Sequence, residues 1–200
     1  MIHLVRHGET TGNARRVFQF PDTPLSERGL EQAHALAARF RNSPVSMVLC
    51  SDYKRAEATA RCVAEATSAP LSIEPLLRER CFGDLRGTPY AELDVDPFAP
   101  DFAPAGGETW AAFHQRVDTA WLRVQQVAAD AAGPLIVVTH GLVCLSLALR
   151  HLTLPRDHEI ETTGFANTSV TTLEAQAPFR VTQLACTGHL DGIADDVAPV

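Results

Sequence analysis

Two apolar runs, far apart in the chain, both end in a His-Gly pair. Residues 1–6 lead into His7-Gly8, and residues 134–139 lead into His140-Gly141. Short, continuously apolar runs of this kind are typical of strands that are buried on both faces, as in the parallel sheet of an α/β protein. Ligands bind such sheets in crevices at the carboxyl ends of the strands. The sequence therefore predicts that two histidines face one another across a single crevice.

Apolar runs that alternate with helical patterns predict an α/β fold for the whole chain. We expect further strands at residues 45–50, 72–74, 168–174 and 179–185. Expected helices begin at an N-cap, Ser26, and at Ser51-Asp52, and two more cover about 108–130 and 142–151. Residues 8–24 read as a polar loop. No linker or repeat divides the 200 residues, so one domain over 1–200 is predicted.

The region from about residue 80 to 107 differs from the rest of the chain. Glycine and proline are dense there, which predicts irregular structure with one short helix near 88–93. So long a connection in a compact domain is usually functional, and we expect a lid-like insertion, with a plain surface insertion as the alternative. The aromatic side chains expected to face a substrate are Phe82, Tyr90, Phe98 and Phe102.

Charge and cysteine content exclude several classes of protein. The net charge of −7 argues against a nucleic-acid partner or an anionic membrane surface. Five scattered cysteines without a CxxC pair predict neither a disulfide framework nor a zinc site, and they favour a reducing, cytoplasmic setting. No signal peptide or membrane-length apolar run is expected. The oligomeric state stays open, with a homodimer among the options, and residues 194–200 are expected to be mobile.

Arginines accompany the two histidines. Arg6 precedes His7, and Arg55 lies one helical turn after the strand at 45–50. If the strands are parallel neighbours, both guanidinium groups meet His7 and His140 at one edge of the sheet. Two guanidinium groups match the charge of a phosphoryl group and can each bind it in bidentate fashion. The pattern therefore predicts a phosphate site.

Several motifs, in order along the chain, resemble those of the histidine phosphatase superfamily, the cofactor-dependent phosphoglycerate mutase-like proteins. They are Arg6-His7-Gly8-Glu9-Thr10 with Asn13, residues 24–29, residues 51–56 with Thr59-Ala60, Leu77-Arg78-Glu79 with Phe82-Gly83 and Gly87, residues 106–109, Thr139-His140-Gly141, and residues 167–170. The resemblance covers most of the chain. It implies a three-layer α/β/α sandwich with a mostly parallel central sheet.

The resemblance also implies roles for single residues. His7 would be the nucleophile that becomes phosphorylated, and Glu79 would be the general acid and base. The residues that would hold the phosphoryl group are Arg6, His7, Asn13, Gln19, Arg55, His140 and Gly141. No metal or other cofactor is implied.

The sequence leaves other interpretations of these residues open. Glu79 lies between two arginines and would, without the resemblance, read as a solvated ion-pair residue, and Gln19 would read as a plain loop residue. His3 and His7 are four residues apart, but on a strand they do not form the helical pair that binds zinc in metalloproteases.

The resemblance implies either a phosphatase or a mutase. Mutases of this family carry extra lysine and arginine after the catalytic glutamate, whereas residues 87–107 here contain none. They carry instead four carboxylates that we expect to face the substrate and repel a polyanion, Glu92, Asp94, Asp96 and Asp101. Only Arg80 and Arg86 keep the mutase alternative open.

The sequence thus predicts a histidine acid-type phosphatase, a metal-independent hydrolase of small-molecule phosphomonoesters that acts through a phosphohistidine and releases inorganic phosphate. The alternatives are interconversion of 2- and 3-phosphoglycerate and, more remotely, a non-catalytic module that binds a phosphorylated ligand.

Overall fold

The computed structural model describes residues 1–155 and 164–193, and the expected mobility of 194–200 lies outside these residues. Six strands form one sheet in the order β3-β2-β4-β1-β5-β6. The strands are β1 (Ile2–Arg6), β2 (Met47–Cys50), β3 (Leu71–Ile73), β4 (Leu135–Thr139), β5 (Val170–Leu173) and β6 (Val181–Cys186). β1 to β4 run parallel. At one edge of the sheet, β5 pairs antiparallel with β1, and β6 pairs antiparallel with β5. The prediction of an α/β fold with a mostly parallel sheet is confirmed.

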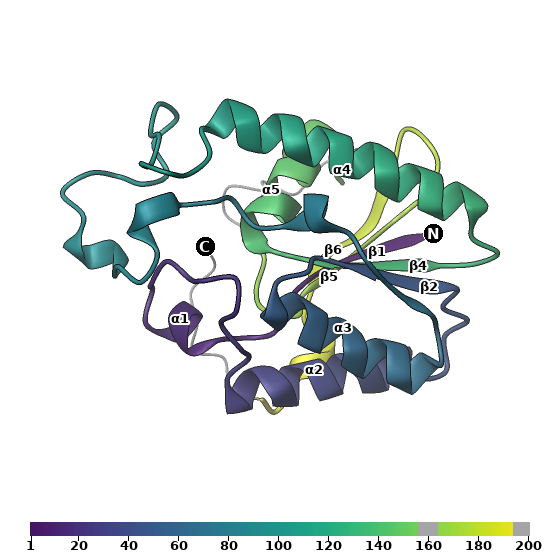
Figure 1. Cartoon of the computed structure of the whole chain (residues 1–200). Helices are drawn as coiled ribbons and strands as arrows, with labels where there is room; N and C mark the ends of the chain where they lie inside the picture. Colours follow the sequence, from purple (N-terminus) through teal and green to yellow (C-terminus); the bar gives the residue numbers. More distant parts are fainter. Residues whose placement is uncertain (156–163, 194–200) are drawn as a thin grey trace.

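Helices cover both faces of the sheet. Figure 1 shows α2 (Glu27–Phe40) and α3 (Lys54–Thr67) on one face, and α4 (Trp110–Asp130) and α5 (Gly141–Arg150) on the other. Alternate side chains of the central strands pack against opposite helical layers. Val5 and Val138 face α2 and α3, whereas Leu4 and Val137 face α4 and α5. This double burial explains why β1 and β4 are continuously apolar.

Local capping explains where the helices begin. The side chain of Ser26 accepts a hydrogen bond from the Gly29 amide at the start of α2, and Thr109 does the same for Ala112 at the start of α4. The 8–24 region, expected to be a loop, contains a short helix, α1 (Thr11–Ala14). Reciprocal hydrogen bonds between Thr10 and Asn13 form a capping box there, so a helix too short for an apolar period is still held.

The 80–107 segment extends beyond the sheet at the end where β1, β2 and β4 finish (Figure 1). It is irregular, as expected, with single 3₁₀ turns at Gly83–Leu85 and Tyr90–Glu92. Its base is closed at Gly83, which has a φ of +55°. A Cβ there would lie 2.0 Å from the Ala105 carbonyl oxygen, so only glycine fits.

Candidate active site

The predicted histidines meet at the carboxyl end of the parallel strands. Arg6 is paired in register with Thr139, so the residues that follow, His7 and His140, leave neighbouring strands side by side. Their rings lie 5.0 Å apart, edge to face. Both side chains are almost fully buried. The topology thus builds the crevice that the sequence predicted.

Two hydrogen bonds fix the tautomer of His7. Its Nδ1 lies 2.7 Å from the Gly8 carbonyl oxygen, which can only accept, so Nδ1 carries the proton. Its Nε2 accepts a hydrogen bond of 3.2 Å from Nε of Arg55 and is therefore unprotonated. Burial, aided by the charges of Arg55 and Arg6, holds the pKa of His7 well below 6.5. Nε2 is consequently a neutral nitrogen with a lone pair at neutral pH.

The second histidine is also fixed by a neighbour. Ser51, which follows β2, accepts a hydrogen bond from the Tyr53 amide and can donate its hydroxyl proton to Nε2 of His140, 2.9 Å away. When Ser51 donates in this way, Nδ1 of His140 carries the proton, and this buried atom has no partner among residues 1–155 and 164–193. Burial, with nearby Arg55, holds the pKa of His140 well below 6.5. The imidazole is thus a neutral hydrogen-bond donor.

The two arginines are buried and anchored from behind. The guanidinium of Arg6 donates to the Phe165 carbonyl, and its buried Nε has no partner in the part of the chain that the structure describes. Gly141 lies against this guanidinium, because a Cβ there would stand 3.5 Å from that Nε, at ordinary van der Waals contact. Arg55 donates from Nη1 to the Phe20 carbonyl as well as from Nε to His7. Burial lowers the pKa of Arg55 to about 10, so it stays charged at neutral pH.

Glu79 lies in the wall of this cavity rather than in solvent, so the ion-pair interpretation is wrong. One carboxylate oxygen accepts from the Arg80 amide at 3.0 Å, and the other from the Leu142 amide, in the first turn of α5, at 3.2 Å. Burial raises the pKa of Glu79, and this effect outweighs both amides and the charges of Arg55 and Arg6. A carboxyl group with a raised pKa is suited to general acid catalysis.

Arg116, in α4, holds the backbone that carries Glu79. It donates to the carbonyl oxygens of Leu76 and Arg78 at 2.8 Å and to that of Glu79 at 3.3 Å. Its guanidinium is paired with the Glu108 carboxylate at 2.7 Å. No motif pointed to Arg116, since a single arginine on a long helix normally lies in solvent. Ser51 and Glu108 belong to the quoted motifs, yet nothing in the sequence assigned them these contacts.

Five of the seven predicted phosphate-binding residues line the cavity, and His140 and Gly141 are not among its lining residues. Asn13 and Gln19 both line it. The Asn13 amide oxygen accepts from the Thr10 backbone amide at 3.1 Å, and the Gln19 amide oxygen accepts from the Thr10 hydroxyl at 2.7 Å. An amide whose oxygen accepts from Thr10 directs its NH₂ group away from Thr10, and a group that donates hydrogen bonds to a phosphate must present NH₂ in this way. Four arginines and Glu79 are the charged residues of the lining. The cavity therefore concentrates positive charge in a protein whose net charge is −7. The full lining is Arg6, His7, Asn13, Phe18, Gln19, Tyr53, Arg55, Glu79, Arg80, Phe82, Arg86, Tyr90, Phe98 and Leu142.

Three of the four predicted aromatic residues line the cavity, namely Phe82, Tyr90 and Phe98. Phe102 is not among the lining residues, so its prediction as a substrate contact is wrong. It contributes its carbonyl oxygen, which accepts a 2.6 Å hydrogen bond from Arg80. An irregular segment has no regular repeat, so the sequence positions of its aromatic residues could not show which side chains point into the cavity.

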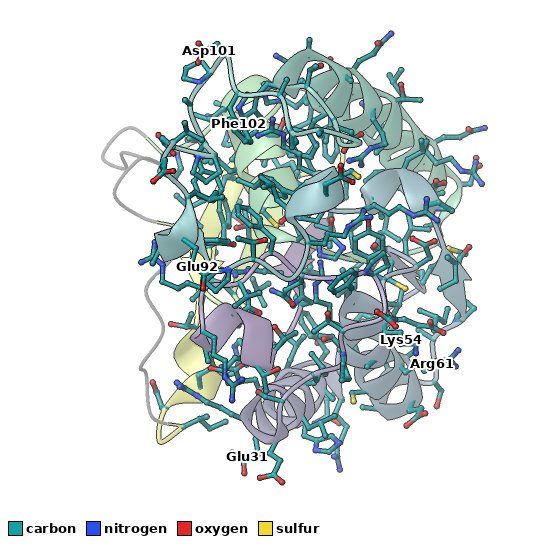
Figure 2. The ribbon with its side chains drawn as sticks, turned by 60° about the vertical axis from the view of Figure 1, so that its left-hand side comes forward. Glu31, Lys54, Arg61, Glu92, Asp101 and Phe102 are labelled. Atoms are coloured by element: carbon teal, nitrogen blue, oxygen red, sulfur yellow. The ribbon has the colours of Figure 1, made fainter. Side chains whose placement is uncertain are left out.

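The expectation that lid carboxylates face the substrate is also wrong. All four are exposed, and none lines the cavity. Figure 2 shows Asp101 at the outer edge of the molecule. Arg80, by contrast, is buried and donates to the carbonyl oxygens of Pro97, Phe102 and Glu108. Its guanidinium carbon lies 3.9 Å from the centre of the Trp110 ring, so Arg80 holds the segment together.

Two features of the described residues bear on metals and membranes. In residues 1–155 and 164–193, no three His, Cys, Asp or Glu side chains are grouped so that they could hold a metal ion. None of the helices found in the same residues is both long and apolar enough to cross a membrane.

Comparison with known proteins agrees with the site. The family model of the histidine phosphatase superfamily (branch 1) matches residues 2–184, and the chain belongs to this family. An adenosylcobalamin/alpha-ribazole phosphatase of Salmonella typhimurium is 36% identical over 164 residues, which cover 77% of this chain and 80% of that protein. A probable phosphoglycerate mutase of Yersinia pestis is 41% identical over 93 residues, less than half of either chain.

Solved structures give the same result. Bacillus stearothermophilus YhfR has a TM-score of 0.79 at 30% identity, and the match covers 94% of this chain and 98% of that one. A mycobacterial glucosyl-3-phosphoglycerate phosphatase has a TM-score of 0.73 at 29% identity and covers 86% and 90%. The relatives named as phosphatases match over most of the chain. The prediction of a phosphatase is confirmed, with a mutase as the weaker alternative.

Proposed function

We propose that this protein is a histidine acid-type phosphatase that hydrolyses a small-molecule phosphomonoester through a phosphohistidine on Nε2 of His7. The observation that carries the proposal is the fixed tautomer of His7. Its Nδ1 proton is held by the Gly8 carbonyl, so Nε2 faces Arg55 with its lone pair. The 80–107 segment would act as a lid on a single domain that spans residues 1–200.

In the first step, Nε2 of His7 attacks phosphorus while the bond to the leaving oxygen breaks. Arg6, Arg55 and the Nδ1–H of His140 would donate to the phosphoryl oxygens, where the charge of the transition state is spread. Arg55 exchanges its hydrogen bond with Nε2 for one with the phosphoryl group as the substrate enters. Glu79, whose pKa is raised by burial, gives its proton to the leaving alcohol.

In the second step, water attacks the phosphohistidine. The Glu79 carboxylate takes one proton from that water, the N–P bond breaks, and inorganic phosphate leaves. His7 returns to its neutral tautomer and Glu79 to its protonated form. Guanidinium groups supply the positive charge in this scheme, so no metal is required. Neither nucleic acid nor a membrane is a partner in it, and a cytoplasmic location stays a prediction.

A mutase would need a second site for the other anionic group of its substrate. Two arginines kept this alternative open. Arg80 donates to three backbone carbonyl oxygens, so of the two only Arg86 remains to bind a second anionic group. We therefore favour water as the phosphoryl acceptor. A module that merely binds a ligand would not need Glu79 beside the phosphate site, which disfavours that alternative.

Rapid labelling tests the proposal. Brief incubation with a ³²P-labelled aryl phosphate, followed by an alkaline quench, should leave acid-labile label on His7 of the wild-type protein and none on His7→Ala. Phosphate release should persist in EDTA. Labelling of His7→Ala, or activity lost in EDTA and restored by a divalent cation, would contradict the mechanism. Faster isomerisation of phosphoglycerate than hydrolysis would favour the mutase.

A further inference from the structure

An apolar groove of about 410 Å³ lies beside the catalytic cavity. Its floor is one face of α5, where Leu142, Leu145, Ser146 and Leu149 follow each other at helical spacing. A groove of this volume is large enough for a substrate group of moderate size. The mechanism proposed above makes no use of it.

The opposite wall comes from α4 and from the 80–107 segment. Trp110 and His114, one helical turn apart, present stacked rings 5.6 Å between centres. Nε1 of Trp110 donates to the Ala99 carbonyl at 2.8 Å, which ties this wall to the segment. Phe98 and Pro100 complete the lining from that segment. The groove is thus a built site between ordered elements.

The groove and the catalytic cavity adjoin one another. Phe98 and Leu142 line both of them. Leu142 also donates its backbone amide to the Glu79 carboxylate, the group that would protonate the leaving oxygen. A general acid must lie within hydrogen-bond distance of the atom it protonates. The first atoms of the leaving group therefore lie next to Leu142, and the groove continues from there.

The groove differs from the cavity in its chemistry. The cavity carries four arginines, whereas among residues 1–155 and 164–193 no aspartate, glutamate, lysine or arginine lines the groove. Its polar side chains, His114 and Ser146, are 2.8 Å apart and hydrogen-bonded to one another. Burial lowers the pKa of His114, so this histidine is neutral at physiological pH. Such a lining favours an uncharged group that displaces water from carbon surface.

We propose that this groove binds the leaving alcohol of the substrate, and that the natural substrate is the phosphomonoester of an alcohol with an uncharged, largely apolar body. The proposal rests on the proposed function, because it takes the leaving group to depart past Glu79. A partner protein or a second copy of this chain could also cover an apolar groove, and the test separates those occupants.

A homologous series of n-alkyl phosphates tests the proposal. From ethyl to octyl phosphate the charge and the reacting bond stay the same, and only the apolar length grows. Full burial of a methylene group corresponds to about a fourfold gain. We therefore expect kcat/KM to rise about two- to fourfold per added methylene until the groove is filled. A kcat/KM that is flat or falls along the series would overturn the proposal.

Two variants locate the effect. Leu149 is 61% exposed at the outer end of the groove, so Leu149→Ser should fold normally, and Leu145→Ser probes the middle. Each should lower the octyl-to-ethyl ratio of kcat/KM at least fivefold. Leu122, on the outer face of α4 and 66% exposed, is the matched control, and Leu122→Ser should leave the ratio unchanged. An unchanged ratio in both groove variants would assign the groove to another occupant.

Failure of the underlying function would look different. If no alkyl or aryl phosphate is hydrolysed and none labels His7, the proposed phosphatase itself is wrong. If ethyl phosphate is hydrolysed and labels His7 without a gain from longer chains, only the groove proposal fails. A concentration-dependent dimer that Leu149→Ser dissociates would identify a second copy of the chain as the occupant and would likewise overturn the proposal.

Discussion

A neutral imidazole can donate from either nitrogen, so a site that uses one needs a neighbour that selects the tautomer. For His7 that neighbour is a backbone carbonyl, which no side-chain substitution removes. For His140 it is the hydroxyl of Ser51. The second arrangement is therefore open to a direct test.

Ser51→Ala should lower kcat/KM about fivefold. A hydrogen bond of this kind is worth about 1 kcal/mol, and its loss lets His140 turn its proton away from the phosphoryl group. The measurement is steady-state hydrolysis of an aryl phosphate. Ser169→Ala is the matched control, because Ser169 is also buried and its hydroxyl has no partner among the described residues. Equal effects of the two substitutions would contradict the role given to Ser51.

Glu79→Gln should slow the enzyme in a manner that depends on the leaving group. An alkoxide needs a proton as it departs, whereas p-nitrophenolate does not, so the loss in phosphorylation rate should be about 100- to 10,000-fold for an alkyl phosphate and far smaller for p-nitrophenyl phosphate. Single-turnover labelling of His7 measures this step.

The pH dependence of the wild type follows from the same carboxyl group. Labelling by the alkyl phosphate should fall as the pH rises through the raised pKa of Glu79, because the acid loses its proton. In Glu79→Gln that limb should disappear. If Glu79→Gln lowered the phosphorylation rate equally for the alkyl phosphate and for p-nitrophenyl phosphate, Glu79 would not act as the acid.

At the scale of elements, the 80–107 segment depends on one buried side chain. Arg80 donates to the carbonyl oxygens of Pro97, Phe102 and Glu108, and so connects parts of the segment that otherwise have little regular structure. Hydrogen bonds from a charged donor are among the stronger ones in proteins. The segment should therefore open locally when this guanidinium is removed.

Arg80→Met should accelerate chymotryptic cleavage at the aromatic residues of the segment at least about tenfold. Loss of hydrogen bonds to a charged group, at about 1.5–3 kcal/mol each, lowers the free energy of local opening. Limited proteolysis with mass spectrometry of the fragments gives the rate. Arg61→Met, which removes an exposed ion pair on α3, serves as control. Resistance equal to that of the wild type would mean that other contacts hold the segment.

The elements differ in how far the sequence predicted them. β1 and β4 were evident because both of their faces are buried, and His7 and His140 followed from their ends. α1 escaped prediction, since a four-residue helix held by a capping box has no apolar period. The exposed carboxylates and Phe102 were misplaced because side-chain direction in an irregular segment depends on tertiary contacts, above all those of Arg80.

At the scale of the whole molecule, protonation should couple the site to stability. Burial is the largest cause that lowers the pKa of five histidines, His3, His7, His114, His140 and His189. For His3 and His189 the pKa falls to about 4. The unfolded chain, with ordinary histidine pKa values near 6.5, therefore binds more protons than the folded protein in this range.

The free energy of unfolding should therefore decrease as the pH falls from about 6.5 towards 4, by up to about 1.4 kcal/mol per pH unit for each such histidine. Glu79 opposes this trend, because its raised pKa lets the folded protein take up that proton first. Urea unfolding at several pH values measures the slope. His3→Gln should reduce this slope by the contribution of about one proton. Glutamine is chosen because it can still form a hydrogen bond with Thr172, the present partner of His3. The exposed His34 provides the control, and a slope that His3→Gln and His34→Gln change equally would refute the assignment.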